Sequence, residues 1–347
     1  MKNKQPPRRL FGLTILGGMI LLGTCGQLPD YRSFADMDLK PPVLVLAGAP
    51  DALTVELTFD EAIDSEAELF PPPSLSLAGY RVEENRLIVE LEHSQIPGTA
   101  YPLEGRVQDK RENSLSFLCY FYGYNPSPPV MIINEFTVEG STTHPDVVEL
   151  RVLSSGNAAG MALLEGVQND YKDRFIFPSV ELTEGEYVVI HFKPQGIPGE
   201  QNETGADLGA SGGLDAGPGY RDFWVPGGDG LPNSHGVLSL CLYPGGPLID
   251  GVVYSTGNSA TAARYRGFGS AATLAQAEYL AAQGGWEVQG AEILPEADAI
   301  NPEDSTATRS LNRDTAGTDT NSKDDWHIVP NSKYTFGRAN SPEIFSP

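Results

Sequence analysis

The chain has 347 residues, and its 46 acidic residues outnumber the 23 basic ones, which gives a formal net charge of −23. Nucleic-acid binding depends on neutralising phosphates with lysine and arginine, so this balance excludes a nucleic acid as the partner. The 38 glycines and 28 prolines, together with 9% aromatic residues, favour a loop-rich β protein over a disordered chain. The length allows two domains.

The first 24 residues have the pattern of a secretory signal peptide. All four charged residues before position 10 are basic, and an apolar stretch follows over residues 10–22. A basic start, a short apolar run and small residues after it are typical of such a leader. The apolar run is shorter than the roughly 20 residues that a membrane-spanning helix needs.

The end of this leader, Leu22-Gly23-Thr24-Cys25, resembles the lipobox of bacterial lipoproteins. The resemblance implies that residues 1–24 are removed and that Cys25 becomes the lipidated first residue. Its acyl chains would bind the membrane with about 0.8 kcal/mol per buried CH₂. The protein would then be exported and lipid-anchored to a bacterial membrane, facing the periplasm or the cell surface. The alternative is an ordinary signal peptide with an incidental cysteine.

A polar tether over residues 25–41 leads into a first domain, expected over residues 42–125. Period-two alternation over residues 53–59 predicts a half-buried strand with Leu57 on its inward face. Further strands are predicted over residues 80–82, 86–91, 101–107 and 114–122. Short strands separated by turns favour a β-sandwich.

Three motifs mark this first domain: Phe59-Asp-Glu-Ala-Ile-Asp64, Pro97-Gly-Thr-Ala-Tyr101, and Val107-Gln-Asp109 followed by Asn113. Together they resemble the bacterial Ig-like domains of surface proteins. The resemblance implies an Ig-like sandwich that acts as a spacer or stalk.

A proline-rich boundary over residues 125–129 separates the first domain from a second one, expected over residues 130–342. Alternation in its second strand points Val148 and Leu150 inward and Glu149 outward. The strand over residues 186–192 is apolar on both faces, which predicts a central position in its sheet. The predicted strands cover residues 130–136, 146–152, 186–192, 236–243 and 249–255.

Seven motifs follow one another along the second domain. They are Ile133-Asn-Glu135, Val148-Glu-Leu150, the strand over 186–192, Leu248-Ile-Asp-Gly-Val-Val-Tyr254, Ser310-Leu-Asn-Arg313, Asp319-Thr-Asn-Ser-Lys-Asp-Asp-Trp326 and Phe336-Gly-Arg-Ala-Asn340. In this order they resemble the lamin-tail domain, an Ig-like sandwich of nuclear lamins and many bacterial exported proteins. The resemblance implies a binding or attachment module without agreed catalytic residues. Relative to a compact version, insertions are expected at about residues 194–230 and 256–301.

The second insertion contains the one predicted helix, over residues 274–283. Thr273 is its expected N-cap, and Gly284 its expected end. Its narrow apolar side, with Ala277 and Leu280, predicts that it lies on the sandwich surface. The expected fold class is therefore all-β: two Ig-like β-sandwich domains in tandem, the second with long loop insertions and one short helix.

The sequence contains no recognisable catalytic motif. There is no Gly-x-Ser-x-Gly elbow, no Walker-type phosphate loop and no zinc-ligand spacing among the five histidines. Cys119 and Cys241 lie in different predicted domains, and we expect two free thiols. A disulfide between them is the alternative.

One acidic loop, over residues 314–325, hints at a ligand. Asp319, Asn321 and Asp324 place the oxygen ligands that Ca²⁺ prefers close together in sequence. The spacing and closing glutamate of an EF-hand are absent, and Asx side chains also bond the backbone of their own turns. A structural turn is therefore favoured over a Ca²⁺ site, and no cofactor is expected.

These patterns predict a lipid-anchored cell-envelope protein that is not an enzyme. Its Ig-like stalk would present the lamin-tail-type domain to an unknown envelope or surface protein or a glycan. The alternative is an exported metal-dependent hydrolase, or an accessory subunit of one, which would need a cleft with three or more Asp, Glu or His. A pure spacer would have neither a pocket nor an exposed patch.

Overall fold

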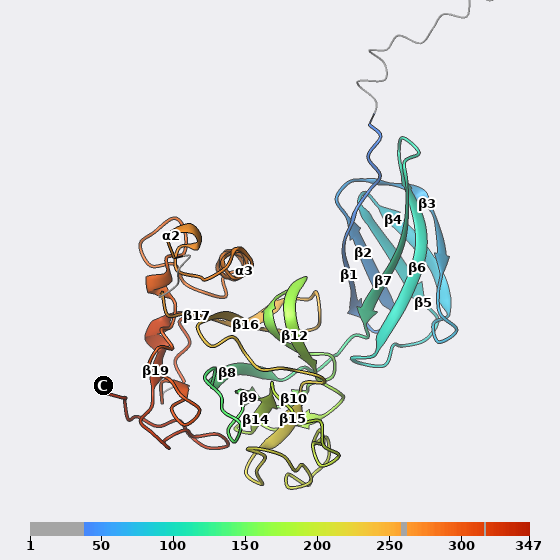
Figure 1. Cartoon of the computed structure of the whole chain (residues 1–347). Helices are drawn as coiled ribbons and strands as arrows, with labels where there is room; N and C mark the ends of the chain where they lie inside the picture. The colour runs from blue at the N-terminus through green and yellow to red at the C-terminus, as the bar shows by residue number, and fades with distance from the viewer. Residues whose placement is uncertain (1–37, 258–261, 316) are drawn as a thin grey trace, which may run out of the picture. The chain divides into compact units, whose positions relative to one another are not determined.

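The computed structural model describes residues 38–257, 262–315 and 317–347 (Figure 1). The expected signal peptide, Cys25 and most of the tether therefore lie outside the described residues. The all-β fold class is confirmed, because strands far outnumber helices in the described part of the chain. Among these residues, no helix is long and apolar enough to span a membrane.

Residues 44–122 form a first sandwich of antiparallel strands (Figure 1). One sheet has the strand order β1-β2-β5-β4 and the other β3-β6-β7. The strands are β1 (Leu44–Asp51), β2 (Thr54–Phe59), β3 (Ile63–Phe70), β4 (Leu77–Glu83), β5 (Arg86–Leu91), β6 (Ala100–Asp109) and β7 (Ser114–Tyr122).

The core of the first sandwich confirms the alternation predicted for β2. Val55, Leu57 and Phe59 are buried against residues of the opposite sheet such as Leu103. Leu53, which shares their alternation, is exposed in the turn before β2. Alternation therefore identifies the buried face only as far as the strand itself extends.

Residues 130–328 form a second sandwich with its own hydrophobic core. A four-stranded sheet has the order β12-β11-β16-β17 and a six-stranded sheet the order β15-β14-β9-β8-β18-β19, while β10 and β13 form a small third sheet. The strands are β8 (Val130–Phe136), β9 (Val147–Ser154), β10 (Gly156–Asn157), β11 (Ala162–Val167), β12 (Asp170–Ile176), β13 (Glu181–Leu182), β14 (Tyr187–His191), β15 (Arg221–Trp224), β16 (His235–Cys241), β17 (Leu248–Ser255), β18 (Leu311–Arg313) and β19 (Trp326–Ile328). The helices are α2 (Ala262–Tyr265), α3 (Ala271–Ala282), and the 3₁₀ turns η1 (Glu296–Asp298) and η2 (Lys323–Asp325).

The five strands predicted in the second domain are all present, and β14 is an interior strand between β15 and β9 as expected. The first expected insertion is not wholly loop, because it contains β15, which pairs in parallel with β14. β15 has only four residues, too short for alternation to predict it. It forms because β14 offers it a free edge.

Helix α3 lies against β16 and β11 and buries Ala277 and Leu280, as its narrow apolar side predicts. Its N-cap is Ser270 rather than the predicted Thr273, because the Ser270 hydroxyl accepts the hydrogen bond from the Thr273 amide. A Cβ atom at Gly251 of β17 would meet Leu280 at 2.7 Å, so this glycine makes room for the helix.

Candidate functional site

The outer face of the six-stranded sheet is polar and nevertheless buried. Val148 and Leu150 of β9 point into the core, and Glu149 points to the opposite face, as predicted. Glu149 nevertheless does not reach the solvent, because its exposed fraction is 0%. Two segments cover this face through the hydrogen bonds described below: part of the 194–230 insertion, and residues 330–341, which we call the cover segment.

Glu149 of β9 lies directly opposite Glu135 of β8 in the antiparallel ladder. A β-bulge between Ile133 and Glu135 adds Asn134 as an extra residue. The Asn134 side-chain nitrogen lies 2.7 Å from Glu149 Oε1 and donates to it. Like charges directly opposite each other destabilise a sheet, so this carboxylate pair requires hydrogen-bond donors or a proton.

The cover segment supplies donors to both carboxylates. The Thr335 amide donates to Glu135 Oε1 at 2.8 Å, and the Thr335 hydroxyl donates to Oε2 at 2.6 Å. The Gly337 amide donates to Glu149 Oε2 at 2.6 Å. Ser310, just before β18, adds its hydroxyl to Glu135 Oε1 at 2.5 Å. Residues 335–337 are therefore held to the sheet mainly through this pair.

Burial raises the pKa of Glu135 to about 7, although hydrogen bonds from Ser310 and Thr335 act in the opposite direction. Burial also raises the pKa of Glu149 well above its usual range, and the neighbouring Glu135 charge raises it further. Two interacting carboxyls titrate as a pair. Near neutral pH the pair therefore retains a proton.

Arg313 of β18 connects the two sheets through the interior. Its side chain, 1% exposed, donates from Nη2 to Asp250 Oδ2 of β17 at 3.0 Å and from Nε to the Ile133 carbonyl at 2.9 Å. A third bond joins Nη1 to Asp319 Oδ1 at 2.8 Å, and the guanidinium lies 4.8 Å above the Trp326 ring. Burial raises the pKa of Asp250 to about 6, against the opposing effect of Arg313.

The 194–230 insertion packs on the β14–β15 end of the same outer face. His191 Nε2 lies 2.7 Å from Asp222 Oδ1, and the imidazole stacks on Trp224 with ring centroids 3.9 Å apart. Glu203 accepts hydrogen bonds from the amides of Asp222 and Ser211, both at 2.9 Å. These buried polar residues hold the insertion on the sheet.

The three residues of the acidic loop do not converge on one point; each is engaged elsewhere. Asp319 Oδ1 accepts from Arg313 Nη1 at 2.8 Å. Asn321 Nδ2 donates to the Gly284 carbonyl at 3.1 Å. Asp324 Oδ2 accepts from Gln289 Nε2 at 3.1 Å. The loop's buried carboxylate, Asp325, accepts from the Thr320 amide and hydroxyl, both at 2.7 Å. The acidic side chains of this loop hold its turn and bind a buried arginine.

We expect the melting temperature in millimolar Ca²⁺ to equal the melting temperature in Mg²⁺ at the same concentration, because Asp319 already binds Arg313. A ligand present at 100 times its Kd stabilises the folded state by roughly 2.7 kcal/mol, so a real site would be visible. Asp319→Asn should lower the melting temperature equally with and without Ca²⁺. A Ca²⁺-specific rise that Asp319→Asn abolishes would contradict this structural role.

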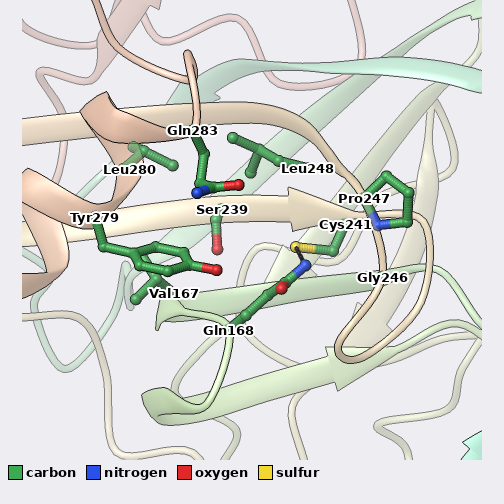
Figure 2. Close-up of a pocket in the computed structure, with 10 residues that line it drawn as sticks. All are labelled: Val167, Gln168, Ser239, Cys241, Gly246, Pro247, Leu248, Tyr279, Leu280 and Gln283. Atoms are coloured by element: carbon green, nitrogen blue, oxygen red, sulfur yellow. Dashed lines mark hydrogen bonds between the residues drawn. The ribbon is translucent and has the colours of Figure 1, made fainter. Parts of the chain in front are cut away.

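A small cavity lies between α3 and the strands β11 and β16 (Figure 2). Its volume is about 60 Å³, and Gln168, Ser239, Cys241 and Tyr279 are among its lining residues. Pockets for drug-sized ligands have volumes of about 300–1,000 Å³, whereas one water occupies about 30 Å³ in the liquid. The cavity can hold one or two waters but no metabolite.

The thiol in this cavity is not activated. Gln168 Nε2 lies 3.8 Å from Cys241 Sγ and donates to it, and burial raises the pKa of the Cys241 thiol. Burial also raises the pKa of Cys119 in the first sandwich to about 11. Reactive cysteines have lowered pKa values, so neither thiol is suited to nucleophilic chemistry. Both cysteines are free, as predicted.

The sequence predicts no role for Glu135, Glu149, Asp250 or Arg313, although each lies in one of the second-domain motifs. The available signal is a charged residue within an otherwise apolar strand, such as Glu135 in β8. Buried charges in such strands are paired or hydrogen-bonded. The sequence does not reveal their partners, which lie far away along the chain.

Comparison with known proteins identifies the second sandwich. A family model described as TP_1001_2nd, protein second domain, matches residues 129–328. An uncharacterized protein of Treponema pallidum (strain Nichols) is 30% identical over 236 residues, which cover 65% of this chain and 56% of that protein. The match thus spans only about half the length of that relative. Because the family model covers more than half of the chain, the protein belongs to the TP_1001_2nd protein second domain family.

Proposed function

We propose that the protein is a lipid-anchored cell-envelope protein whose two sandwiches form a non-catalytic binding or structural module. The observation that carries the anchor is the motif Leu22-Gly23-Thr24-Cys25 directly after the apolar stretch over residues 10–22. A lipid on Cys25 would supply the membrane affinity.

The non-catalytic part of the proposal is supported by how the polar side chains of the second sandwich are used. Its histidines each have a separate intramolecular partner instead of converging on one site. The pairs are His144 with Asp215, His191 with Asp222, His235 with Ser255, and His327 with the Ser341 carbonyl. The most deeply buried carboxylates, in turn, bond the cover segment and Arg313.

The two family resemblances suggest a different role for each sandwich. The first sandwich would act as a bacterial Ig-like stalk, and the second as a lamin-tail-type module that binds an envelope protein or a glycan. The support is the order of the seven second-domain motifs and the strands that contain or flank the first six of them. Among the described residues of the second sandwich, a metal-dependent hydrolase has no comparable support.

We expect Cys25→Ser to move the protein from the membrane fraction to the soluble envelope fraction or the medium, because the variant lacks the acceptor for the lipid. Fractionation of cells that express the full chain measures this. Metabolic labelling with palmitate should label the wild-type chain and leave Cys25→Ser unlabelled.

Cys119→Ser is the matched control, since Cys119 is a half-buried thiol of the first sandwich. It should be labelled and should fractionate like the wild-type chain. If Cys25→Ser still partitions with membranes and takes up palmitate, the lipid anchor at this position is disproved.

A further inference from the structure

Glu135 and Glu149 pair with each other in the interior of the six-stranded sheet, where Asn312 pairs with Glu135 and the apolar Val189 pairs with Glu149. Both carboxyl groups are fully buried, and the cover segment is what separates them from solvent on this face. Two carboxylates on residues that lie directly opposite each other in a ladder repel unless one of them is protonated.

The hydrogen-bond partners decide which carboxyl can hold a proton. The partners of Glu149 are N–H groups of Asn134 and Gly337, which donate and favour the ionised form. The partners of Glu135 include two hydroxyls, on Ser310 and Thr335, and a hydroxyl can accept a hydrogen bond as well as donate one. The network is therefore complete when Glu135 is protonated and Glu149 is ionised.

The surrounding charges do not neutralise a second carboxylate. The charges of Arg338 in the cover segment and Arg151 in β9 lower the pKa of Glu135 and Glu149 respectively, against the larger effect of burial. Among the described residues, neither arginine forms a salt bridge with either glutamate. The other titratable neighbours, Tyr187 and Tyr220, have pKa values raised by burial and are neutral in this range.

We propose that Glu135 and Glu149 form a pH-dependent latch: while they share one proton they hold the cover segment on the sheet, and loss of that proton releases it. Once the proton is lost, both carboxylates are ionised and require water. They reach it when residues 330–341 lift from the outer face. This proposal does not depend on the lipid anchor or on the function proposed above.

The direction of the pH dependence follows from the raised pKa of the pair. Folding raises the pKa of Glu135 from 4.5 to about 7 and raises the pKa of Glu149 well above 4.5, so the stabilisation is fully present below about pH 4.5. It is lost as the pH rises past about 7 and the pair gives up its last proton. The latch should therefore be closed in mildly acidic surroundings and open in alkaline ones.

Trypsin cleavage after Lys333 and Arg338 measures the opening, because both sites lie in the cover segment. The full chain is digested in detergent at about pH 6 and about pH 9, and each rate is divided by that of a synthetic peptide with the sequence of residues 328–345. We expect the normalised rate of the wild-type chain to rise at least about tenfold between the two pH values. Tryptophan fluorescence at both pH values checks that the second sandwich stays folded.

Glu135→Gln mimics the protonated side chain and should keep the normalised rate within about twofold across the same range. The matched control, Glu104→Gln on the exposed face of the first sandwich, should behave like the wild-type chain. A wild-type rate that does not change with pH, or a Glu135→Gln chain with the wild-type rise, would overturn the proposal. If Glu135→Gln does not fold, Glu135→Met provides the comparison, because it also leaves Glu149 as the single carboxylate of the pair.

Discussion

Replacing Arg313 with methionine is expected to destabilise the second sandwich by about 3–5 kcal/mol, because removing one partner of a buried ion pair leaves the other uncompensated. Asp250 is completely buried and would lose the cation 3.0 Å from its carboxylate. The Ile133 carbonyl would lose its bond from Arg313 Nε, and Trp326 its stacked guanidinium. Methionine fills much of the volume but replaces none of these donors.

Urea unfolding followed by tryptophan fluorescence measures this change. All three tryptophans, Trp224, Trp286 and Trp326, lie in the second sandwich or its insertions, so the signal reports on that part of the chain. Arg313→Lys should also be strongly destabilising, because a lysine cannot bond Asp250, Asp319 and a carbonyl in one plane. Arg81→Ala, at an exposed ion pair of the first sandwich, should leave the midpoint almost unchanged. A midpoint for Arg313→Met equal to that of Arg81→Ala would show that the buried arginine is dispensable.

The second large effect concerns the first sandwich, where Leu57→Asp should prevent folding. Loss of the leucine side chain from a packed core costs about 2–5 kcal/mol, and the carboxylate must in addition leave water or take up a proton. A domain of ordinary stability has only about 5–15 kcal/mol in total. Leu57 is 0% exposed and packs in the core of this sandwich, so the structure offers the carboxylate no solvent.

Far-ultraviolet circular dichroism should show the loss of part of the β signal in Leu57→Asp, with the tryptophan fluorescence of the second sandwich retained. Thr58→Asp is the matched control, since residue 58 points to the opposite, half-exposed face of β2. It should keep the full β signal. Equal losses in the two variants would refute the inward assignment of Leu57.

The buried polar residues on the outer face of the six-stranded sheet hold the segments that cover this face. A sheet whose outer face carries Glu149, His191 and Asp222 would ordinarily be solvated on that face. Here two irregular segments cover it and provide the donors that the carboxylates require. The same arrangement makes the cover sensitive to the protonation of the carboxylates it covers.

Local pattern alone was sufficient for much of the fold. Alternation predicted β2, β7 and β9 because inward and outward side chains alternate along a strand, and turn residues between apolar runs predicted β5 and β17. It did not predict β3, a sheet-edge strand with an exposed Phe70, or β15, which has four residues. Edge and very short strands are stabilised by their pairing partner more than by their own composition.

The site depended on tertiary structure. The sequence predicts that Glu149 points outward and that Asp319 belongs to a structural turn, but it does not reveal what covers Glu149 or what Asp319 binds. The outcome was decided by partners far along the chain: Ser310 reaches Glu135 across 175 positions and Thr335 across 200. Side-chain alternation depends on the strand itself, whereas burial of a polar face depends on which distant segment folds over it. For this protein, the sequence determined which residues face outward, and only the tertiary structure decided that some of them are covered.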